Sequence, residues 1–589
     1  MPRKAHTGLT RLLPYAGDKR LQLATVGALA ALSAAAPVAG WHLVGEAIDG
    51  GIRDGDTDYL ARVVLAYVGV NAAAWGLGTL TWLGLAGVGQ RIVLELRRDL
   101  FHHLTALSLR YFSQQKAGWI ISRLTSDVDA LSDVLNQGLT TLVVSTLTFV
   151  AAIGGLFLLD WRLGLVALCV VPPGVVVTRW FQRRSHTAAA EVRTRIAIVT
   201  AQLAESVSGM AVIQAFNRER AFQAEFDRLN EDNRRANVTV QRIYSLFFPA
   251  VELLGVIATA AVLFAGAHLI GAGTMEIGTL VAAVGLLALV FQPLQELSEL
   301  YGQVQAANAA MDKISSVLDA EPDIADAPHA RPLGRVEGRL QLDRVTFAYG
   351  RDPVLHELEL EVPAGGCVAL VGESGGGKST TAKLVARFYD PSEGAVRVDG
   401  VDLRDIELRS YRRQLGVVLQ DPFLFSGTIA DNIRFAKPDA TDDEVRAAAA
   451  AVGVDRVAAR LEGGLDHAVR EGGAGLSAGE RQLISIARAL LADPRILILD
   501  EATSNIDRPT EILIERAFDR LLAGRTSIII AHRLGTVRRA DEILVVEHGR
   551  IVQRGSEREL LATDGPFRRL ADGLERDELA PVAAGASAA

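Results

Sequence analysis

The sequence has few charged residues, few aromatic residues and almost no cysteine. Of its 589 residues, 22% are charged, 6% are aromatic and two are cysteines, Cys169 and Cys367. Two cysteines so far apart exclude a disulfide framework, and we expect each to be a small buried apolar residue. A net charge of −8 argues against a nucleic-acid binder that relies on a basic surface. With 49% hydrophobic residues, the composition favours a membrane protein with more than one domain.

Six apolar runs in the first half of the chain are long enough to cross a bilayer, and no comparable run follows residue 300. They lie near residues 21–48, 59–88, 137–159, 161–182, 244–270 and 276–295. The first run is rich in alanine and follows Lys19 and Arg20, so a cleaved signal peptide is the alternative interpretation. Because Pro37 and Trp41 continue this run past a plausible cleavage site and further runs follow, the sequence predicts six transmembrane helices.

Lysine and arginine residues gather on alternate connections between these runs. Arg53 stands alone among acidic residues in the first connection, whereas the segment before the first run contains Arg3, Lys4, Arg11, Lys19 and Arg20. Basic residues are frequent again in the long connections after the second and fourth runs. Because cytoplasmic loops carry the excess of Lys and Arg, the N-terminus and the C-terminal half are predicted to be cytoplasmic.

The two long basic connections have the pattern of continuing helices. Apolar residues recur there at spacings of three and four, as at Val93, Leu96, Leu100, Leu104 and Leu107. Gly118, Ser208 and Gly209 interrupt the pattern. We therefore expect the helices to extend beyond the membrane and to turn at Tyr111–Gly118 and Ser206–Ala211.

Two polar residues are candidates for a pathway through the membrane. Glu252 stands in an apolar stretch after Pro249, where an ionisable group is costly unless it faces a cavity or a partner. A hydrogen bond to a neighbouring helix is the alternative explanation for Glu252. Gln292 is the second candidate, and its place near a span end is also explained by exposure to water. Neither residue identifies a transported molecule.

A second domain follows a polar, proline-rich linker at residues 321–335. Val368–Val371 is typical of a buried strand, and it leads through a glycine-rich loop into a helical pattern. This order of strand, loop and helix is the setting of a phosphate-binding P-loop, here Gly372, Glu373, Ser374, Gly375, Gly376, Gly377, Lys378, Ser379 and Thr380. Its glycines let backbone N–H groups wrap phosphates, Lys378 reaches the β- and γ-phosphates, and the Ser379 hydroxyl ligates Mg²⁺.

Two more buried strands end in chemically useful residues. Residues 495–499 lead into Asp500 and Glu501, an arrangement in which Asp500 holds the Mg²⁺ shell and Glu501 polarises water. The alternative interpretation of Asp500 and Glu501 is an acidic strand end that is simply exposed to water. The strand at Ile528–Ala531 presents His532, which by itself is more often structural.

With these residues in place, the second domain resembles the cassette of ATP-binding cassette (ABC) transporters, and the whole chain resembles an exporter-type half-transporter. The segment Gly475-Leu476-Ser477-Ala478-Gly479-Glu480-Arg481-Gln482 is similar to the family's signature motif. The resemblance implies that Ser477, Gly479 and Glu480 contact ATP held by a partner cassette. A helix N-terminus there suits an anion.

The resemblance implies roles for further residues. Tyr349 corresponds to the aromatic residue that stacks on adenine, Gln420 to the Mg²⁺ and water contact, Asp507 to the dimer-contact loop and His532 to the γ-phosphate sensor. Glu471 resembles part of the loop that touches the partner's helices. The turns at Tyr111–Gly118 and Ser206–Ala211 resemble coupling helices, and residues 1–20 resemble an interfacial elbow.

The signature departs from the family's pattern at two positions. The usual sequence has glycine and glutamine where this chain has Ala478 and Glu480. We expect Ala478 to tighten the approach to phosphate. Glu480 can still accept a hydrogen bond from ribose, but it adds a negative charge near a triphosphate, so this half of the ATP site is expected to be weaker than usual. The half-site built by the chain's own Lys378, Asp500, Glu501 and His532 is expected to be hydrolytic.

The resemblance implies a fold that combines a six-helix membrane bundle with a cytoplasmic α/β P-loop ATPase cassette. The expected boundaries are an elbow at 1–20, the transmembrane domain at 21–320, the linker at 321–335, the cassette at 336–575 and a disordered tail at 576–589. Because a P-loop and a signature of one chain cannot close on one nucleotide in the family's geometry, we expect a dimer of half-transporters. The altered signature favours a partner that is a different chain, with a second copy as the alternative.

The expected function is ATP-driven export or flipping of amphipathic small molecules, lipids or peptides across a bacterial-type plasma membrane. Import of metal chelates on an exporter scaffold is one alternative. An ATP-gated channel or a regulatory membrane ATPase needs the same cassette and is another. A soluble cassette protein that acts on nucleic acid is excluded by the six apolar runs.

Overall fold

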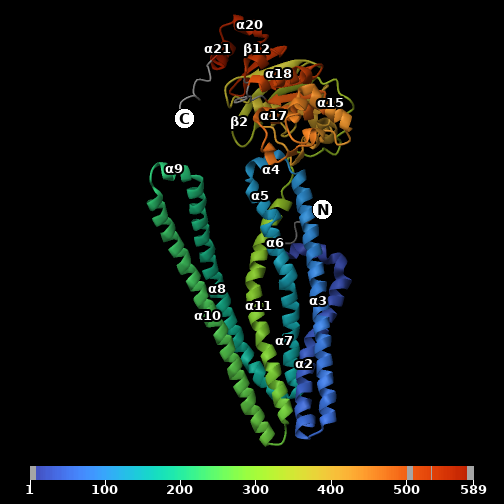
Figure 1. Cartoon of the computed structure of the whole chain (residues 1–589), viewed down its shortest axis with the longest axis vertical. Coiled ribbons are helices and arrows are strands. Elements are labelled where there is room, and N and C mark those ends of the chain that lie inside the picture. Colours follow the sequence, from blue (N-terminus) through green and yellow to red (C-terminus); the bar gives the residue numbers. More distant parts are fainter. Residues whose placement is uncertain (1–7, 501–507, 532, 580–589) are drawn as a thin grey trace. The chain divides into compact units, whose positions relative to one another are not determined.

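The chain forms two compact units in a computed structural model that describes residues 8–500, 508–531 and 533–579 (Figure 1). The first unit comprises residues 1–106 and 116–320, and the second comprises residues 107–115 and 321–589. The short segment 107–115 therefore belongs to the second unit although its neighbours on both sides belong to the first. Each unit is described by itself below.

The first unit is a bundle of long helices. In the part of the chain that the structure describes, six helical stretches are long and apolar enough to span a membrane, Arg20–Arg53, Thr57–Ala106, Ala117–Leu159, Trp161–Ser208, Glu219–Gly271 and Ile277–Leu318. The prediction of six spans is thus confirmed. At 1.5 Å per residue, the 50-residue stretch Thr57–Ala106 is about 75 Å long, against about 30 Å for the hydrocarbon core. The helices therefore continue well beyond a membrane, as their periodicity indicates.

These stretches contain the following elements. Short turns η1 (Gly8–Leu12), α1 (Leu13–Ala16) and η2 (Gly17–Lys19) precede α2 (Arg20–Glu46), η3 (Ala47–Arg53) and α3 (Thr57–Ala106). Then come α5 (Ala117–Leu124), α6 (Ser126–Asp133), η4 (Val134–Gly138), α7 (Leu139–Leu159), α8 (Trp161–Ser208), α9 (Met210–Ala215), α10 (Glu219–Gly271) and α11 (Ile277–Leu318). The connections α2–α3, α7–α8 and α10–α11 lie at one end of the bundle, which we call the short-loop end (Figure 1).

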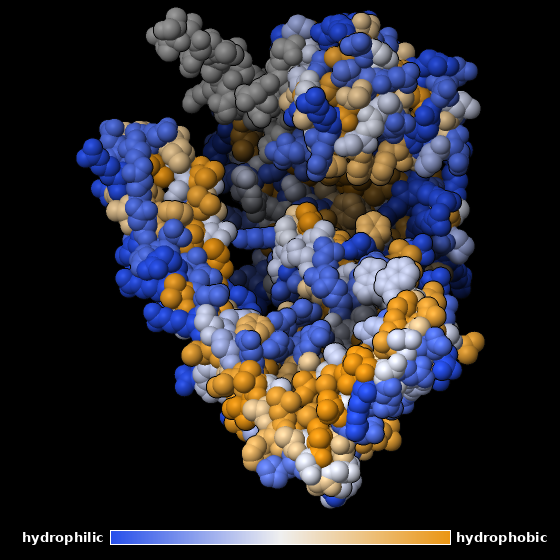
Figure 2. All heavy atoms as spheres, turned by 60° about the horizontal axis from the view of Figure 1, so that its bottom comes forward, coloured by the Kyte–Doolittle hydropathy of each residue, from blue (hydrophilic) through white to orange (hydrophobic). Residues whose placement is uncertain are grey.

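Apolar side chains cover the outside of the bundle near the short-loop end. Figure 2 shows hydrophobic residues on the part that lies lowest in Figure 1 and hydrophilic residues along much of the α8–α10 hairpin toward α9. Trp75 and Phe264 are 78% and 71% exposed, which in water is unfavourable for such large apolar groups. Cys169 is also exposed, so the expectation that it is buried is wrong. It lies in the apolar part of α8, where a side chain that faces away from the bundle meets lipid; Cys367 is buried as expected.

Glycines let α2 pack closely against its neighbours. A Cβ on Gly278 of α11 would meet the carbonyl oxygen of Gly45 in α2, and a Cβ on Gly285 would meet the indole of Trp41. Without side chains at these positions the two helix backbones approach closely, as small residues permit in membrane bundles. The packing fixes α2 against α11 at the short-loop end.

The second unit contains two principal sheets. A four-stranded antiparallel sheet has the order β2-β1-β4-β5, with β1 (Leu340–Ala348), β2 (Pro353–Val362), β4 (Glu393–Val398) and β5 (Val401–Asp402). A six-stranded sheet has the order β12-β11-β3-β10-β9-β6, with β3 (Cys367–Val371), β6 (Leu415–Val418), β9 (Ile496–Asp500), β10 (Thr526–Ile530), β11 (Glu542–Glu547) and β12 (Arg550–Gly555). Strands β6, β9, β10, β3 and β11 are parallel neighbours.

The parallel strands are buried on both faces. In β3, Ala369 and Val371 belong to one apolar core, and Val368 and Leu370 belong to a second. Strands covered on both faces are continuous apolar runs, which explains why they are recognisable in the sequence. The principal helices of this unit are α12 (Lys378–Val385), α15 (Asp442–Val452), α17 (Ala478–Leu491), α18 (Arg508–Leu522) and α21 (Pro566–Leu579). The shorter elements include α13 (Leu408–Arg412), α14 (Ile429–Arg434), α16 (Val454–Ala458), β7 (Gly427–Thr428), β8 (Ala468–Val469), α19 (Leu534–Val537) and α20 (Glu557–Ala562).

Helix α4 (Leu109–Gln114) is the part of the first predicted turn that packs in the second unit. The Arg110 Nε lies 3.6 Å from a carboxylate oxygen of Asp323, and the Arg110 guanidinium lies 5.7 Å from the centroid of the Tyr389 ring. The Ser108 hydroxyl donates to Asp323 at 3.1 Å. The second predicted turn is a break at Gly209 followed by α9.

Candidate functional site

The glycine-rich loop after β3 has the backbone of an anion cradle. Gly372, Gly375 and Gly377 have φ angles of 145°, 85° and 108°, which favour glycine strongly. A Cβ on Gly376 would lie 2.7 Å from the carbonyl oxygen of Val546 in β11, so a side chain has no room there. The loop ends at the first turn of α12, where free N–H groups and the helix dipole favour an anion.

Lys378 lies at the first position of α12 and is buried. Its Nζ donates to the carbonyl oxygens of Gly372 at 2.7 Å and Glu373 at 2.8 Å. Burial lowers the pKa of Lys378 because it disfavours the charged form, and the nearby charge of Asp500 acts in the opposite direction. Among the described residues, loop carbonyls and the Asp500 carboxylate surround this buried ammonium, which fits a polyanion such as a triphosphate.

The ends of the parallel strands bring Asp500 and Gln420 to the same edge of the sheet as the P-loop. Asp500 is the last residue of β9, where it pairs in register with Ile530 of β10, and β10 is the neighbour of β3. Gln420 follows β6, whose Val418 pairs with Leu499. Oxygen ligands from Asp500, Gln420 and the exposed Ser379 have the chemistry that Mg²⁺ prefers. Three further predicted site residues, Glu501, Asp507 and His532, lie outside the described residues.

Tyr349 offers an aromatic surface beside the P-loop helix. It directly follows β1, its hydroxyl lies 3.2 Å from the Thr380 hydroxyl, and Lys383 Nζ lies 5.8 Å from its ring centroid. The Tyr389 ring packs edge-on against Tyr349 at 5.2 Å. This packing orients a partly exposed ring next to residues 378–380, as stacking on a base requires. Ser374 and Gly375 are exposed at the tip of the same loop.

The signature segment forms the N-terminal cap of α17. Ser477 is the N-cap, and its hydroxyl oxygen accepts the N–H of Glu480 at 3.2 Å. The Glu480 carboxylate in turn accepts the N–H of Ser477 at 2.8 Å. Glu480 therefore takes part in a reciprocal capping box, and Arg460 lies 3.7 Å from its other oxygen. The spacing Ser-x-x-Glu in the sequence is a signal for this cap, which the interpretation of Glu480 as a ribose contact and an added charge missed. Gly479 is buried in the first turn.

The P-loop and the signature are separate within this chain. Among the described residues, no hydrogen bond or ion pair joins residues 372–380 to residues 475–482. Each lies at the N-terminus of its own helix, α12 for the P-loop and α17 for the signature.

The two pathway candidates of the membrane helices differ in their surroundings. Glu252 is exposed on α10, and no hydrogen bond or ion pair joins it to another described residue. Gln292 on α11 donates from Nε2 to Oε1 of Glu296 at 2.8 Å, and Glu296 Oε2 accepts from the Ser145 hydroxyl of α7 at 2.5 Å. Glu296 joins two membrane helices, a role that its place near a span end did not indicate.

The chain is similar to known transport proteins over nearly its whole length. The family model of the ABC transporter transmembrane region matches residues 23–294, and the ABC transporter model matches residues 355–504. The ATP-dependent lipid A-core flippase of Syntrophus aciditrophicus is 34% identical over 528 residues, 90% of this chain and 88% of the flippase.

Two further similarities concern a longer protein and a solved structure. The multidrug efflux ATP-binding/permease protein Rv0194 of Mycobacterium tuberculosis is 38% identical over 90% of this chain, which spans 44% of that protein's length. A solved bacterial Atm1-family ABC exporter with ATP bound superimposes with a TM-score of 0.80 and 29% identity, covering 96% of this chain and 99% of that chain.

The fold and the site therefore define an ATP-driven membrane transporter, and the chain belongs to the ABC transporter family. It is a half-transporter of the exporter type, with one six-helix transmembrane region and one ATP-binding cassette in a single chain. The cassette couples ATP hydrolysis to transport.

Proposed function

We propose that two half-transporters associate and export or flip an amphipathic small molecule, lipid or peptide across the plasma membrane, with N-terminus and cassette in the cytoplasm. The proposal of a dimer is supported by one observation, the separation of the P-loop from the signature in the described chain. Two cassettes in opposite orientation bring the Lys378 half-site of one chain to a signature of the other. The partner is a second copy or a different half-transporter.

We assign the residues of each half-site as follows. Tyr349 stacks on adenine, and the loop 372–377 and Lys378 hold the phosphates. Ser379, Gln420 and Asp500 hold Mg²⁺, which when bound neutralises charge on the phosphates. Thr380 fixes the Tyr349 hydroxyl at 3.2 Å. Glu501 accepts a proton from the attacking water, and His532 contacts the γ-phosphate.

The signature supplies the second side of the site in this proposal. Ser477 uses its oxygen lone pair in the helix cap, and its O–H remains a donor for a γ-phosphate oxygen. Gly479 keeps the first turn of α17 free of side-chain bulk. Glu480 is held in the cap and by Arg460, so its charge is partly compensated.

The amphipathic substrate class is supported by the relatives, whose names describe a lipid A-core flippase and a multidrug efflux protein. The contact of α4 with Asp323 and Tyr389 supports coupling, because cassette movement is transmitted to the helices on both sides of residues 107–115.

The first test is ATP hydrolysis by the purified chain in lipid nanodiscs, with Glu501→Gln as control and the particle mass measured on the same sample. Activity in a dimeric particle that this substitution abolishes supports a homodimer with Glu501 as base. A monomeric, inactive sample contradicts the homodimer and directs the search to a second chain. Vesicles loaded with a fluorescent phospholipid then give the direction of movement, and an ATPase that moves no probe against a gradient favours a channel or regulatory ATPase.

A further inference from the structure

An apolar groove lies between α2 and α7 in the half of the bundle toward the short-loop end. It has a volume of about 530 Å³ and is lined mainly by small or aliphatic residues, including Ala35 and Ala39 of α2 and Ala151, Gly154 and Leu158 of α7. The volume falls within the range of about 300–1,000 Å³ typical of small-molecule sites. His42 is the one polar side chain in its lining.

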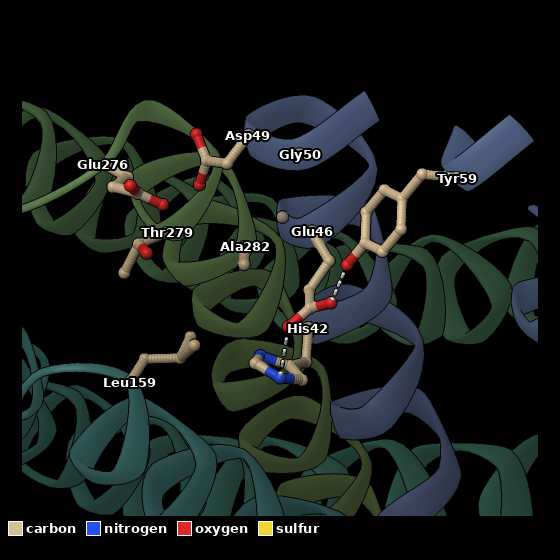
Figure 3. A pocket seen from close by; sticks show the side chains of 10 residues that line it. His42, Glu46, Asp49, Gly50, Tyr59, Leu159, Glu276, Thr279 and Ala282 are labelled. Atoms are coloured by element: carbon tan, nitrogen blue, oxygen red, sulfur yellow. Dashed lines mark hydrogen bonds and ion pairs between the residues drawn. The ribbon is translucent and has the colours of Figure 1, made fainter. Parts of the chain in front are cut away.

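A polar pocket of about 260 Å³ adjoins the groove, and the two cavities share His42 and Leu159. Figure 3 shows His42, Glu46 and Tyr59 on one side of this pocket and Asp49 and Glu276 on the other. The pocket is therefore lined by residues from α2, η3, α3, the end of α7 and the start of α11. The two cavities together therefore form one surface that is apolar in the groove and bears carboxylates in the pocket.

Hydrogen bonds hold two of these carboxylates in place. The Tyr59 hydroxyl donates to Glu46 Oε2 at 2.5 Å, and the Gly278 N–H donates to Asp49 Oδ1 at 2.8 Å. Within the described chain, Glu276 is the pocket carboxylate with a permanently charged partner, Arg53 at 4.0 Å. His42 lies 3.7 Å from Glu46 and is charged only when protonated.

The charge of the pocket is therefore negative. Glu46, Asp49 and Glu276 line the pocket together with His42, and Arg53 pairs with Glu276. Among the described residues, His42 is the ionisable group that the pocket shares with the adjoining groove. A cationic group that enters the pocket is attracted by its net negative charge, whereas an anionic group is repelled. An apolar body in the groove gains burial at about 25 cal/mol per Å².

We propose that the groove and the polar pocket form one binding site for an amphiphile with an apolar body and a cationic head group. This inference rests on the proposed function, because it places the site in the outer-leaflet half of the membrane, where an exported amphiphile leaves the protein. The apolar body lies along Ala35–Ala39 and Ala151–Leu158. The head group lies among Glu46, Asp49 and Glu276.

The test is photo-crosslinking in phosphatidylcholine nanodiscs with two probes that have the same 12-carbon chain and a terminal diazirine. One probe has a trimethylammonium head group and the other has a sulfate head group. Mass spectrometry locates the labelled residues. The expected result is labelling of the groove segments 35–39 and 151–158 by the cationic probe, at least about fivefold above the anionic probe.

Two sets of variants separate the head-group contribution from the groove. Glu46→Gln with Asp49→Asn keeps both hydrogen-bond acceptors, and it is expected to lower labelling by the cationic probe about fivefold or more without lowering that by the anionic probe. Asp54→Asn, in the same connection but outside the pocket lining, is the matched control.

Gly154→Leu fills the groove, because a Cβ at Gly154 meets no atom within 4 Å. Gly69→Leu, an equally open position on α3, is its control.

Each outcome decides the proposal. Equal labelling by both probes, or unchanged labelling in the Glu46/Asp49 variant, overturns the cationic head group. Absence of label from the groove in a dimeric, ATP-hydrolysing sample overturns the site and shows that a partner subunit or lipid covers it. If ATP-driven movement of fluorescent phospholipid persists in that sample, the proposed function stands without the site. If the groove is labelled as expected but no probe is ever moved, the proposed function fails instead.

Discussion

Ser477 and Glu480 cap the first turn of α17 by exchanging two hydrogen bonds, from Glu480 N–H to Ser477 Oγ at 3.2 Å and from Ser477 N–H to Glu480 Oε2 at 2.8 Å. Glutamate and glutamine serve equally in this motif. The unusual residue in the signature therefore preserves the local structure of the motif and changes its charge. The consequence of the departure is electrostatic.

We expect Glu480→Gln to tighten ATP binding about two- to fivefold at low salt, because it removes one negative charge near the triphosphate. Stability is expected to change little, since glutamine keeps the cap. Glu480→Ala is the contrasting variant: it loses the reciprocal bond and is expected to cost about 1 kcal/mol of unfolding free energy. Nucleotide titration of both variants, with thermal unfolding, checks this. Weaker ATP binding by Glu480→Gln would contradict the electrostatic explanation.

The lowered pKa of Lys378 predicts that ATP affinity falls at alkaline pH. Burial disfavours its charged form in the free cassette, whereas a bound triphosphate favours the charged form and raises the pKa. Below the lowered pKa, Lys378 is already charged in the free cassette, so the affinity for ATP does not change with pH. Above this pKa, Lys378 must take up a proton when ATP binds, so the affinity for ATP falls as the pH rises. Calorimetric titrations in two buffers of different ionisation enthalpy measure this uptake.

A control variant distinguishes Lys378 from other alkaline titrations. Lys378→Arg retains a charge at every pH used, so whatever affinity it keeps should show no proton uptake between neutral and alkaline pH. Proton uptake of the same size in this variant would assign the effect to another group. The free energy of unfolding depends on pH in the opposite direction from ATP affinity. Because the pKa of Lys378 is lower in the native state than in the unfolded state, the unfolding free energy rises as the pH rises toward the ordinary lysine pKa.

The bond from Ser145 to Glu296 is expected to stabilise the bundle. Ser145→Ala removes a cross-helix hydrogen bond and leaves one carboxylate oxygen with one donor fewer, which we expect to cost about 1–2 kcal/mol. Ser298→Ala is matched in size and burial, with 4% exposure against 3%, but among the described residues its hydroxyl bonds to Leu294 of its own helix. Thermal unfolding of the two purified variants compares them. A larger loss in Ser298→Ala would contradict the cross-helix role.

The contacts of Arg110 predict a coupling defect. Arg110→Ala removes the ion pair with Asp323 and the contact of its guanidinium with the Tyr389 ring. We expect basal ATP hydrolysis in nanodiscs to stay within about twofold, while its stimulation by the transported molecule is lost. Arg446→Ala breaks an exposed ion pair with Asp443 inside the cassette and is the control. Parallel loss of basal and stimulated hydrolysis in Arg110→Ala would indicate a folding role instead.

The sequence by itself determined the features that depend on neighbouring residues. The six spans are recognisable because lipid selects long apolar runs, and the P-loop because one short loop supplies nearly all of its phosphate-binding groups. The buried strands 368–371 and 528–530 are recognisable because both of their faces are covered, so every residue is apolar. These predictions needed no knowledge of which distant segments meet.

Tertiary structure alone decided the relationships between distant residues. Hydropathy does not show that residues 107–115 pack with the cassette, that Glu296 accepts a bond from Ser145, or that Cys169 faces outward, because each depends on the rotation and pairing of helices. The groove beside Gly154 likewise exists because small residues from α2 and α7, more than 100 positions apart, face one another. Periodicity places a residue on a helix face, and only packing determines what that face meets.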